Sequence, residues 1–244
     1  MVYSTRLPEI SSEPLEFGTS GLLYRSNKLM CDRRTETLWR QFTGEPVVGY
    51  LAESGIRLKR FPVALTTWAD WLNLHPETTV LDIRTGVYSP QTYLPENEPG
   101  AVYNSYFSNP NPIFPVWQRS EALPAKAFVL GVIVNGAPKA YDLVSLVPRP
   151  VYNDRLGGAN IVVVTPPGTS SARAYQRGSI EFREGARAGG EATVTDTAGR
   201  TWRVTEEALV RGDDPSIRLA RLPTHVSFWF GWYAAYPNSE LFKG

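Results

Sequence analysis

The chain has 244 residues, 42% of them hydrophobic and 12% aromatic, which is enough apolar material for the core of one β-rich domain and argues against disorder. Its 25 Lys and Arg residues balance 24 Asp and Glu residues without forming a basic run, so nucleic acid and anionic membranes are poor candidates for partners. The longest apolar runs, 128–134 and 228–236, are too short to span a bilayer.

The N-terminal residues leave the compartment open. Residues 1–8 lack the apolar stretch of a signal peptide, although an export or anchor segment upstream of residue 1 is compatible with this start. Cys31 is the only cysteine, so the sequence predicts no intrachain disulfide. The localisation therefore stays unknown at this point.

Part of the sequence occurs twice. One set of residues returns 161 positions later: Leu58, Pro62, Trp68, Trp71 and Pro76 correspond to Leu219, Pro223, Trp229, Trp232 and Pro237. Upstream, with a small slip, Asp32, Thr35, Trp39 and Gly49 correspond to Asp196, Thr197, Trp202 and Gly212. Such matching spacings indicate a duplicated unit. We expect one domain made of a first repeat (1–83), a connector (84–126) and a second repeat (127–244), related by a pseudo-twofold axis.

The first repeat contains one short helix. Its start is a capping box, Thr67–Asp70, and the helix ends before Pro76. Trp68 and Trp71 then lie on one apolar face. The same pattern predicts a helix at 227–236 in the second repeat.

The connector carries seven prolines and many aromatic residues: Tyr88, Tyr93, Tyr103, Tyr106, Phe107, Phe114 and Trp117. A flexible linker would be poor in aromatic residues. We therefore expect an ordered, extended segment that lies across both repeats and buries these side chains. The alternative is a surface that faces a ligand.

The second repeat begins with a hairpin, in which strands Phe128–Val134 and Ala137–Leu146 flank the turn Asn135-Gly136. Further elements follow along the chain: a turn-rich segment at 151–158 that contains Asn153 and Asp154, a strand at 160–165 and a hairpin at 195–202 that turns at Gly199. The fold class is thus mainly β (α+β), with one short helix per repeat. If both copies were once complete, the first repeat lacks about 35 residues that the second possesses.

Residues shared by the repeats are best explained by the fold. Six tryptophans are expected in the core: Trp39, Trp68, Trp71, Trp202, Trp229 and Trp232. Asp32 and Asp196 are expected to cap turns through backbone amides.

Three segments carry a family resemblance: Phe17–Gly21, Leu29–Gln41, and Ser227–Trp232 with Tyr236-Pro237. With them the chain resembles the bacterial and archaeal family catalogued as domain of unknown function 3179, over nearly its whole length. The stretch Asp-Arg-x-Thr-x-x-x-Trp-x-Gln at 32–41 is specific to that family. Members typically begin with a hairpin and an Asn-Asp turn like those at 128–158, followed by a Cys-Pro-Leu-Cys element.

This chain departs from the family pattern at its start, because residues 1–16 contain no cysteine and Cys31 stands where the family usually has an aromatic residue. The resemblance therefore implies a truncated first repeat, and it puts in doubt any activity that relies on the cysteine pair. It implies no reaction, substrate or cofactor. Members of the family are often exported or membrane-anchored.

Residues present in only one copy are the candidates for function. If Asp32–Trp39 is a strand, Asp32, Arg34 and Glu36 share one face and form a polar patch suited to a carboxylate or amide ligand. The alternative is an exposed strand face with compensating charges. Four further candidates complete the set: Gln41 and His75 in the first repeat, and Asn153 and Asp154 in the second.

No motif indicates a reaction. Residues 17–21 lack the pattern of a nucleophile elbow, and Gly157-Gly158 lacks the lysine of a phosphate loop. His75 and His225 have no neighbour at ligand spacing, so we expect no metal site and no cofactor. The sequence favours a non-catalytic binding or structural module with an aromatic cleft at the repeat interface, whose partner is a small molecule or a protein. The alternative is an enzyme of undefined reaction with a polar site there, impaired by loss of the N-terminal segment.

Overall fold

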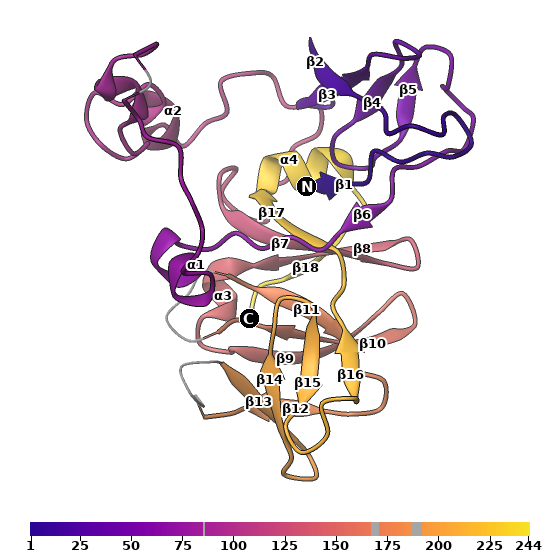
Figure 1. Ribbon diagram of the computed structural model, residues 1–244, viewed down its shortest axis with the longest axis vertical. Helices are drawn as coiled ribbons and strands as arrows, with labels where there is room; N and C mark the ends of the chain where they lie inside the picture. The colour runs from indigo at the N-terminus through magenta and orange to yellow at the C-terminus, as the bar shows by residue number, and fades with distance from the viewer. Residues whose placement is uncertain (85, 167–170, 187–191) are drawn as a thin grey trace.

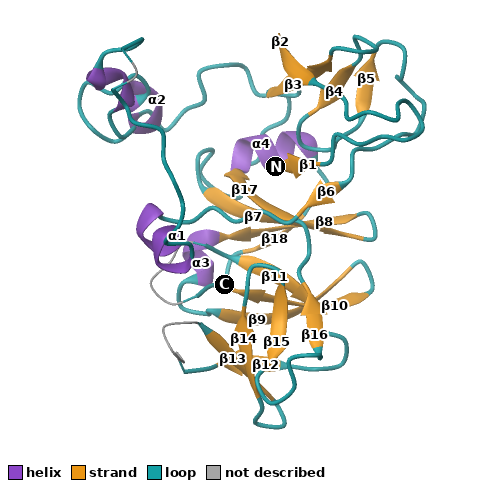
Figure 2. Cartoon of the chain, in the orientation of Figure 1, coloured by secondary structure: helices purple, strands orange, loops and turns teal. Residues whose placement is uncertain are grey.

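The computed structural model describes residues 1–84, 86–166, 171–186 and 192–244. Strands dominate it and the helices are short, which confirms the mainly β fold class. Figure 1 shows the body as a stack, with an N-terminal sheet at the top, helix α4 beneath it and three further sheets below. Figure 2 shows that long loops join these layers on one side of the stack.

Residues 1–61 form an N-terminal unit with its own core. An antiparallel meander and a two-stranded pair build it: β2 (Phe17–Tyr24), β3 (Asn27–Asp32), β4 (Leu38–Arg40), β5 (Pro46–Val48), β1 (Val2–Tyr3) and β6 (Arg60–Phe61). Trp39 is fully buried and packs there with Leu15 and Leu58. The edge of Phe17 meets the face of the Trp39 ring, with centroids 5.9 Å apart.

The chain turns directly after β3. Residues 33–35 form a turn, and Glu36 adopts a left-handed φ of 56°. Buried Asp32 accepts hydrogen bonds from the backbone N–H of Thr35 (2.6 Å) and from Trp39 Nε1 (2.8 Å). The continuous strand on which a shared face of Asp32, Arg34 and Glu36 depended is therefore not formed, because a buried carboxylate that collects these donors closes a turn.

The second Asp-Trp pair has the same arrangement. Asp196 accepts from the backbone N–H of Ala198 (2.9 Å) and from Trp202 Nε1 (3.0 Å). The capping role expected of Asp32 and Asp196 is thus confirmed. In both cases the hydrogen bonds lower the pKa of the carboxyl group, against the effect of burial, which raises it.

The connector loops away from the stack and returns to it (Figure 1). Three short helices lie between the N-terminal unit and the next strand: α1 (Trp68–Leu74), η1 (Pro90–Tyr93) and α2 (Asn104–Ser108). Its aromatic side chains are largely exposed, for example Tyr88 (63%), Phe114 (58%) and Trp117 (67%). The prediction that they are buried is wrong for these residues, since the connector leaves the body instead of lying flat across both repeats.

The central sheet carries the predicted hairpin. Its strands, in spatial order, are β17 (Thr224–Phe228), β7 (Phe128–Val134), β8 (Ala137–Asp142) and β18 (Glu240–Phe242). The hairpin turn is confirmed, because Asn135 and Gly136 have φ values of 49° and 81°. The return strand ends at Asp142, earlier than expected, because the Asp142 carboxylate accepts from the Ser145 N–H and caps helix α3 (Leu143–Leu146).

Two more sheets complete the stack. The middle layer consists of β11 (Arg173–Gln176), β10 (Ala159–Val164) and β9 (Val151–Leu156). The outer layer consists of β12 (Phe182–Glu184), β13 (Thr193–Asp196), β14 (Thr201–Val204), β15 (Ala208–Arg211) and β16 (Arg218–Ala220). Along β10, Ile161 and Val163 pack toward the central sheet, while Val162 and Val164 pack toward the outer sheet. This strand is buried on both faces, which explains its continuous apolar run.

Asn153 and Asp154 lie inside β9, where each pairs with a residue of β10. The turn instead falls on Gly157 and Gly158, both with positive φ. The prediction of a turn at Asn153-Asp154 is therefore wrong by a few residues.

Helix α4 (Trp229–Ala235) covers the other face of the central sheet. Trp229 and Trp232 are 2% and 0% exposed, whereas Trp68 and Trp71 of α1 are 51% and 38% exposed. The core position expected of all six shared tryptophans is confirmed for four and wrong for the two on α1. No residue of α1 is buried.

Candidate functional site

The N-terminal unit meets the C-terminal layers over α4. The Tyr236 hydroxyl, just beyond this helix, donates to the Phe42 carbonyl and accepts from Arg60, both at 2.9 Å. A Cβ added at Gly231 would lie 3.3 Å from the Phe42 ring, so glycine permits this close approach. These contacts fix the position of the N-terminal unit on the helix.

The hairpin β2–β3 reaches from this junction toward the connector. Its turn residues Arg25 and Ser26 have φ values of 47° and 64°, as a tight hairpin requires. The Ser26 hydroxyl accepts from the Trp117 N–H (3.0 Å) and donates to the Pro115 carbonyl (3.2 Å). The connector is therefore fastened to the hairpin tip, and a cleft remains between hairpin, connector and α4.

One part of this cleft is an apolar groove of about 480 Å³. Aromatic and aliphatic side chains from three segments line most of it: Leu23, Tyr103, Tyr106, Phe107, Ile113, Phe114 and Phe230. The rings of Tyr106 and Phe107 lie 6.3 and 6.2 Å from that of Phe228. Such an aromatic surface can hold the apolar body of a ligand.

A smaller cavity of about 250 Å³ adjoins this groove and shares Ser26, Asn27 and Phe230 with it. Three buried polar atoms at this cavity have no hydrogen-bond partner within the described residues: Asn27 Nδ2, His225 Nε2 and Ser227 Oγ. The Asn27 carbonyl oxygen accepts from the Lys28 N–H (2.8 Å), so its amide nitrogen is the end left without a partner. Buried polar groups are usually paired, and three unpaired ones at one cavity indicate a place for a ligand.

His225 and Ser227 alternate along β17 and therefore share the face that looks toward α4 and the N-terminal unit. The His225 ring lies between those of Phe42 (5.1 Å) and Trp232 (5.4 Å). Burial, with smaller contributions from nearby positive charges, lowers the pKa of His225 to about 3. Its imidazole is thus neutral at physiological pH and offers Nε2 as one hydrogen-bonding atom.

Of the candidates from the sequence, only Gln41 lies at this cleft. Arg34 and Glu36 are exposed in the turn after β3, and buried Asp32 is occupied by that turn. His75 is exposed at the C-terminal end of α1. The polar patch of Asp32, Arg34 and Glu36 does not form, and it is not joined by His75.

The remaining candidates, Asn153 and Asp154, support the sheets. The Asn153 side chain donates to the Phe182 carbonyl (2.7 Å) and accepts from the Phe182 N–H (3.0 Å), which ties the middle layer to the outer one. Asp154 pairs with Lys139 (2.8 Å) and accepts from the Tyr141 hydroxyl (2.6 Å). The bonds from Lys139 and Tyr141 lower the pKa of Asp154, although burial acts in the opposite direction.

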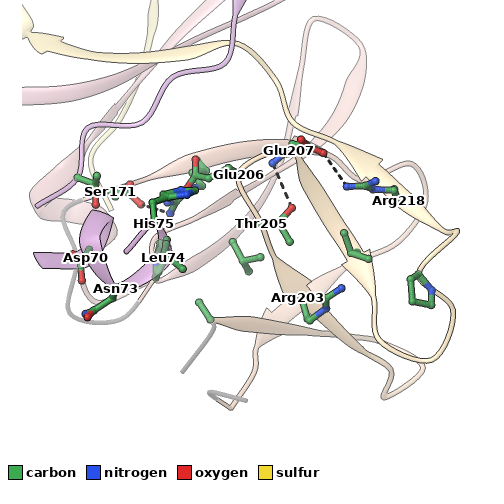
Figure 3. Close-up of a pocket in the computed structure, with 17 residues that line it drawn as sticks. Asp70, Asn73, Leu74, His75, Ser171, Arg203, Thr205, Glu206, Glu207 and Arg218 are labelled. Atoms are coloured by element: carbon green, nitrogen blue, oxygen red, sulfur yellow. Dashed lines mark hydrogen bonds and ion pairs between the residues drawn. The ribbon is translucent and has the colours of Figure 1, made fainter. Parts of the chain in front are cut away.

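His75 borders a different cavity, of about 540 Å³, between α1 and the two lower sheets. Figure 3 shows Asp70, Leu74 and His75 of α1 on one side, and Arg203, Thr205 and Glu206 on the other. Acidic and basic side chains line this second cavity, whereas aromatic and other apolar side chains make up most of the lining of the groove over α4.

Sequence reasoning missed Asn27, His225 and Ser227. A lone histidine carries little information, and Asn27 follows a hairpin turn, where asparagine is common. One signal was present: His225 and Ser227 are polar residues at alternate positions of a strand that leads into an apolar helix.

Two further findings concern metal ligands and membrane spans. Among the described residues, no three His, Cys, Asp or Glu side chains are grouped closely enough to hold a metal ion. Within the same parts of the chain, no helix has the length and apolar character needed to cross a membrane.

Comparison with known proteins gives one match. A family model described as "Protein of unknown function (DUF3179)" matches residues 1–239. Neither the curated proteins nor the solved structures contain a match to this chain.

Proposed function

The chain belongs to the DUF3179 family of proteins of unknown function, and we propose that it is a binding protein for a small, neutral ligand with an aromatic body and an amide group. The ligand occupies the cleft between hairpin β2–β3, the connector and α4. Its aromatic body lies in the apolar groove and its amide group enters the adjoining polar cavity.

The observation that carries this proposal is the set of three unpartnered buried atoms of Asn27, His225 and Ser227. A ligand carbonyl would accept from Asn27 Nδ2, and a ligand N–H would donate to Ser227 Oγ or to neutral His225. An unpaired buried polar atom costs about 1–3 kcal/mol, so each bond formed recovers part of that cost.

The lining of the polar cavity favours a neutral ligand over a cation. Of the described side chains that line it, only that of His225 is titratable, and the charges that act on His225 from nearby, the α-amino group of Met1 and Arg60, are positive. A cationic group placed there would lose its hydration without gaining a counter-ion. Neutral amides and peptide groups avoid this cost.

The enzyme alternative has less support. It required Arg34, Glu36 and His75 to act together, and these residues are exposed on separate segments. We therefore place the binding function first.

The test is calorimetric titration of the full chain with 3-phenylpropionamide. We expect binding that Phe107→Ala weakens about tenfold, because one aromatic contact in the groove is lost. Tyr88→Ala is the matched control, since Tyr88 is an exposed aromatic residue of the connector outside the groove. Absence of binding at millimolar amide, or an equal loss in both variants, would refute the proposal.

We also infer that the two Asp-Trp units descend from one duplicated unit and are related by a pseudo-twofold axis. The pairing of Tyr3 with Arg60 resembles that of Tyr175 with Arg221. Each tyrosine hydroxyl donates to a backbone carbonyl just beyond the tryptophan of its own unit, at 2.7 and 2.8 Å. Matching side-chain hydrogen bonds support common descent better than sequence spacing alone.

This alignment refines the proposed boundaries of the repeats. It equates Tyr3 with Tyr175, so that residues 127–172 have no counterpart within residues 1–83. The difference is about 45 residues rather than about 35. The residues without a counterpart include hairpin β7–β8, which covers α4.

A further inference from the structure

We propose that the charged cavity beneath α1 is a second binding site and that it takes a small organic monocarboxylate. Arg173 lines this cavity and is 7% exposed. Its Nε atom is buried and has no hydrogen-bond partner within the described residues. A buried guanidinium with a free donor, at the wall of a cavity of about 540 Å³, points to an anionic ligand.

The ion pairs behind this wall place two guanidinium groups against one carboxylate among the described residues. Glu206 pairs with both Arg173 and Arg221, the latter at 2.6 Å, so one carboxylate faces two guanidinium groups. The Arg173 and Arg221 side chains are only 8% and 3% exposed. Nε and Nη2 of Arg221 also have no partner among the described residues. A carboxylate that binds at Arg173 would supply the second counter-ion.

The other lining residues select the class of anion. Three carboxylates (Asp70, Glu206 and Glu207) and three guanidinium groups (Arg173, Arg203 and Arg218) line the cavity, and this near balance of charge favours a monoanion over a dianion such as a phosphate monoester. Leu74 and Val204 provide apolar surface for the body of the ligand. A single carboxylate on an apolar body fits both features.

The chain has only two histidines, and they report on the two sites separately. His75 lines the charged cavity, and its ring lies 4.1 Å from that of Trp71. His225 lies at the cleft over α4. Imidazole C–H signals in NMR spectra, assigned with His75→Asn, therefore distinguish this proposal from the function proposed above.

The test is titration of the full chain with 3-phenylpropionate at neutral pH. We expect a shift of the His75 signal with little change at His225, and at least tenfold weaker effects at His75 with 3-phenylpropionamide or phenylphosphonate. An unmoved His75 signal at millimolar carboxylate would overturn the proposal. So would equal binding of the amide at His75.

Variants test the role of Arg173 directly. Arg173→Gln should weaken binding of 3-phenylpropionate at least tenfold, whereas Arg183→Gln, at an exposed position of β12, should leave it unchanged. Because Arg173 is buried, Leu74→Ala on exposed α1 provides a second test in a variant that keeps the ion pairs, with an expected loss of about threefold to tenfold. Unchanged affinity in a folded Arg173→Gln protein, or in Leu74→Ala, would contradict the assignment.

Discussion

Helices α1 and α4 have the same C-terminal structure and different surroundings. In α1, Trp71 Nε1 donates to the Thr78 hydroxyl (2.9 Å), and in α4 Trp232 Nε1 donates to the Ser239 hydroxyl (2.7 Å). Each of these tryptophan rings also lies against the ring of the residue that ends its helix, at 4.1 Å in α1 and 4.6 Å in α4. The local sequence therefore specifies the helix and its C-terminal end in both copies.

The two helices differ in what covers their tryptophans. A Cβ at Gly131 of β7 would lie 2.0 Å from the Trp232 ring, so the glycine leaves the space that this ring fills. Trp71 has no such strand beneath it in the described structure, and it remains 38% exposed. The comparison teaches that a repeated motif reproduces a helix, while its burial depends on strands far away in the sequence.

The largest expected effect comes from removing the same tryptophan in each copy. Trp232→Ala should lower the free energy of unfolding by about 4 kcal/mol, because it opens a cavity in a closed core. Trp71→Ala should cost less than about 1 kcal/mol, because its ring is partly exposed. Urea unfolding followed by circular dichroism measures both values. Equal costs would show that α1 is covered in solution in a way that the structure does not contain.

A smaller effect is expected where the two copies agree. Asp32→Ala and Asp196→Ala should each lower the free energy of unfolding by about 3 kcal/mol, since each leaves a buried indole N–H and a backbone N–H without an acceptor. Asp213→Ala, at an exposed aspartate, is the control and should change it by less than about 0.5 kcal/mol. A loss confined to one of the two buried aspartates would break the proposed equivalence of the units.

The smallest expected effect is a pH dependence of the free energy of unfolding that involves His225 and not His75. The pKa of His225, lowered to about 3, lies below the ordinary value, so the unfolded chain binds a proton that the folded chain rejects. The contribution of neutral His225 to the free energy of unfolding is complete above about pH 6.5 and is lost as pH falls toward about 3. Between pH 7.5 and pH 5 this contribution declines by about 2 kcal/mol.

His225→Leu should remove most of this decline, and His75→Asn should preserve it. Unfolding by urea at the two pH values measures the difference. The same slope in the His225→Leu protein would show that this imidazole is not buried in its neutral form.

Features set by neighbouring residues were predictable from the sequence. The Asn135-Gly136 turn needs two positive φ values, and asparagine and glycine supply them. Helix α1 begins where the capping residue predicts, since the Thr67 hydroxyl accepts from the Asp70 N–H (3.1 Å). Such features depend on a few adjacent residues and hardly on the rest of the fold.

Features set by distant residues were not predictable. Trp68 is exposed because α1 in the described structure lacks a packing partner such as the one that β7 provides for α4, and the sequence around Trp68 does not reveal this. The meeting of Asn27 with His225 joins segments that lie about 200 residues apart in the chain. The connector aromatics were placed in the core because aromatic residues are usually buried, and here Tyr103, Tyr106, Phe107 and Phe114 border a cleft instead.

The most direct measurement of the central claim, a ligand cleft over α4, is an NMR titration of the full chain with 3-phenylpropionamide, read at the His225 ring and at the side-chain amide of Asn27. We predict that the His225 and Asn27 signals shift together and that the His75 signal stays in place. Ser227→Ala should weaken binding of the amide, read from these shifts, several-fold. A shift at His75 alone, or no shift at millimolar amide, would contradict it.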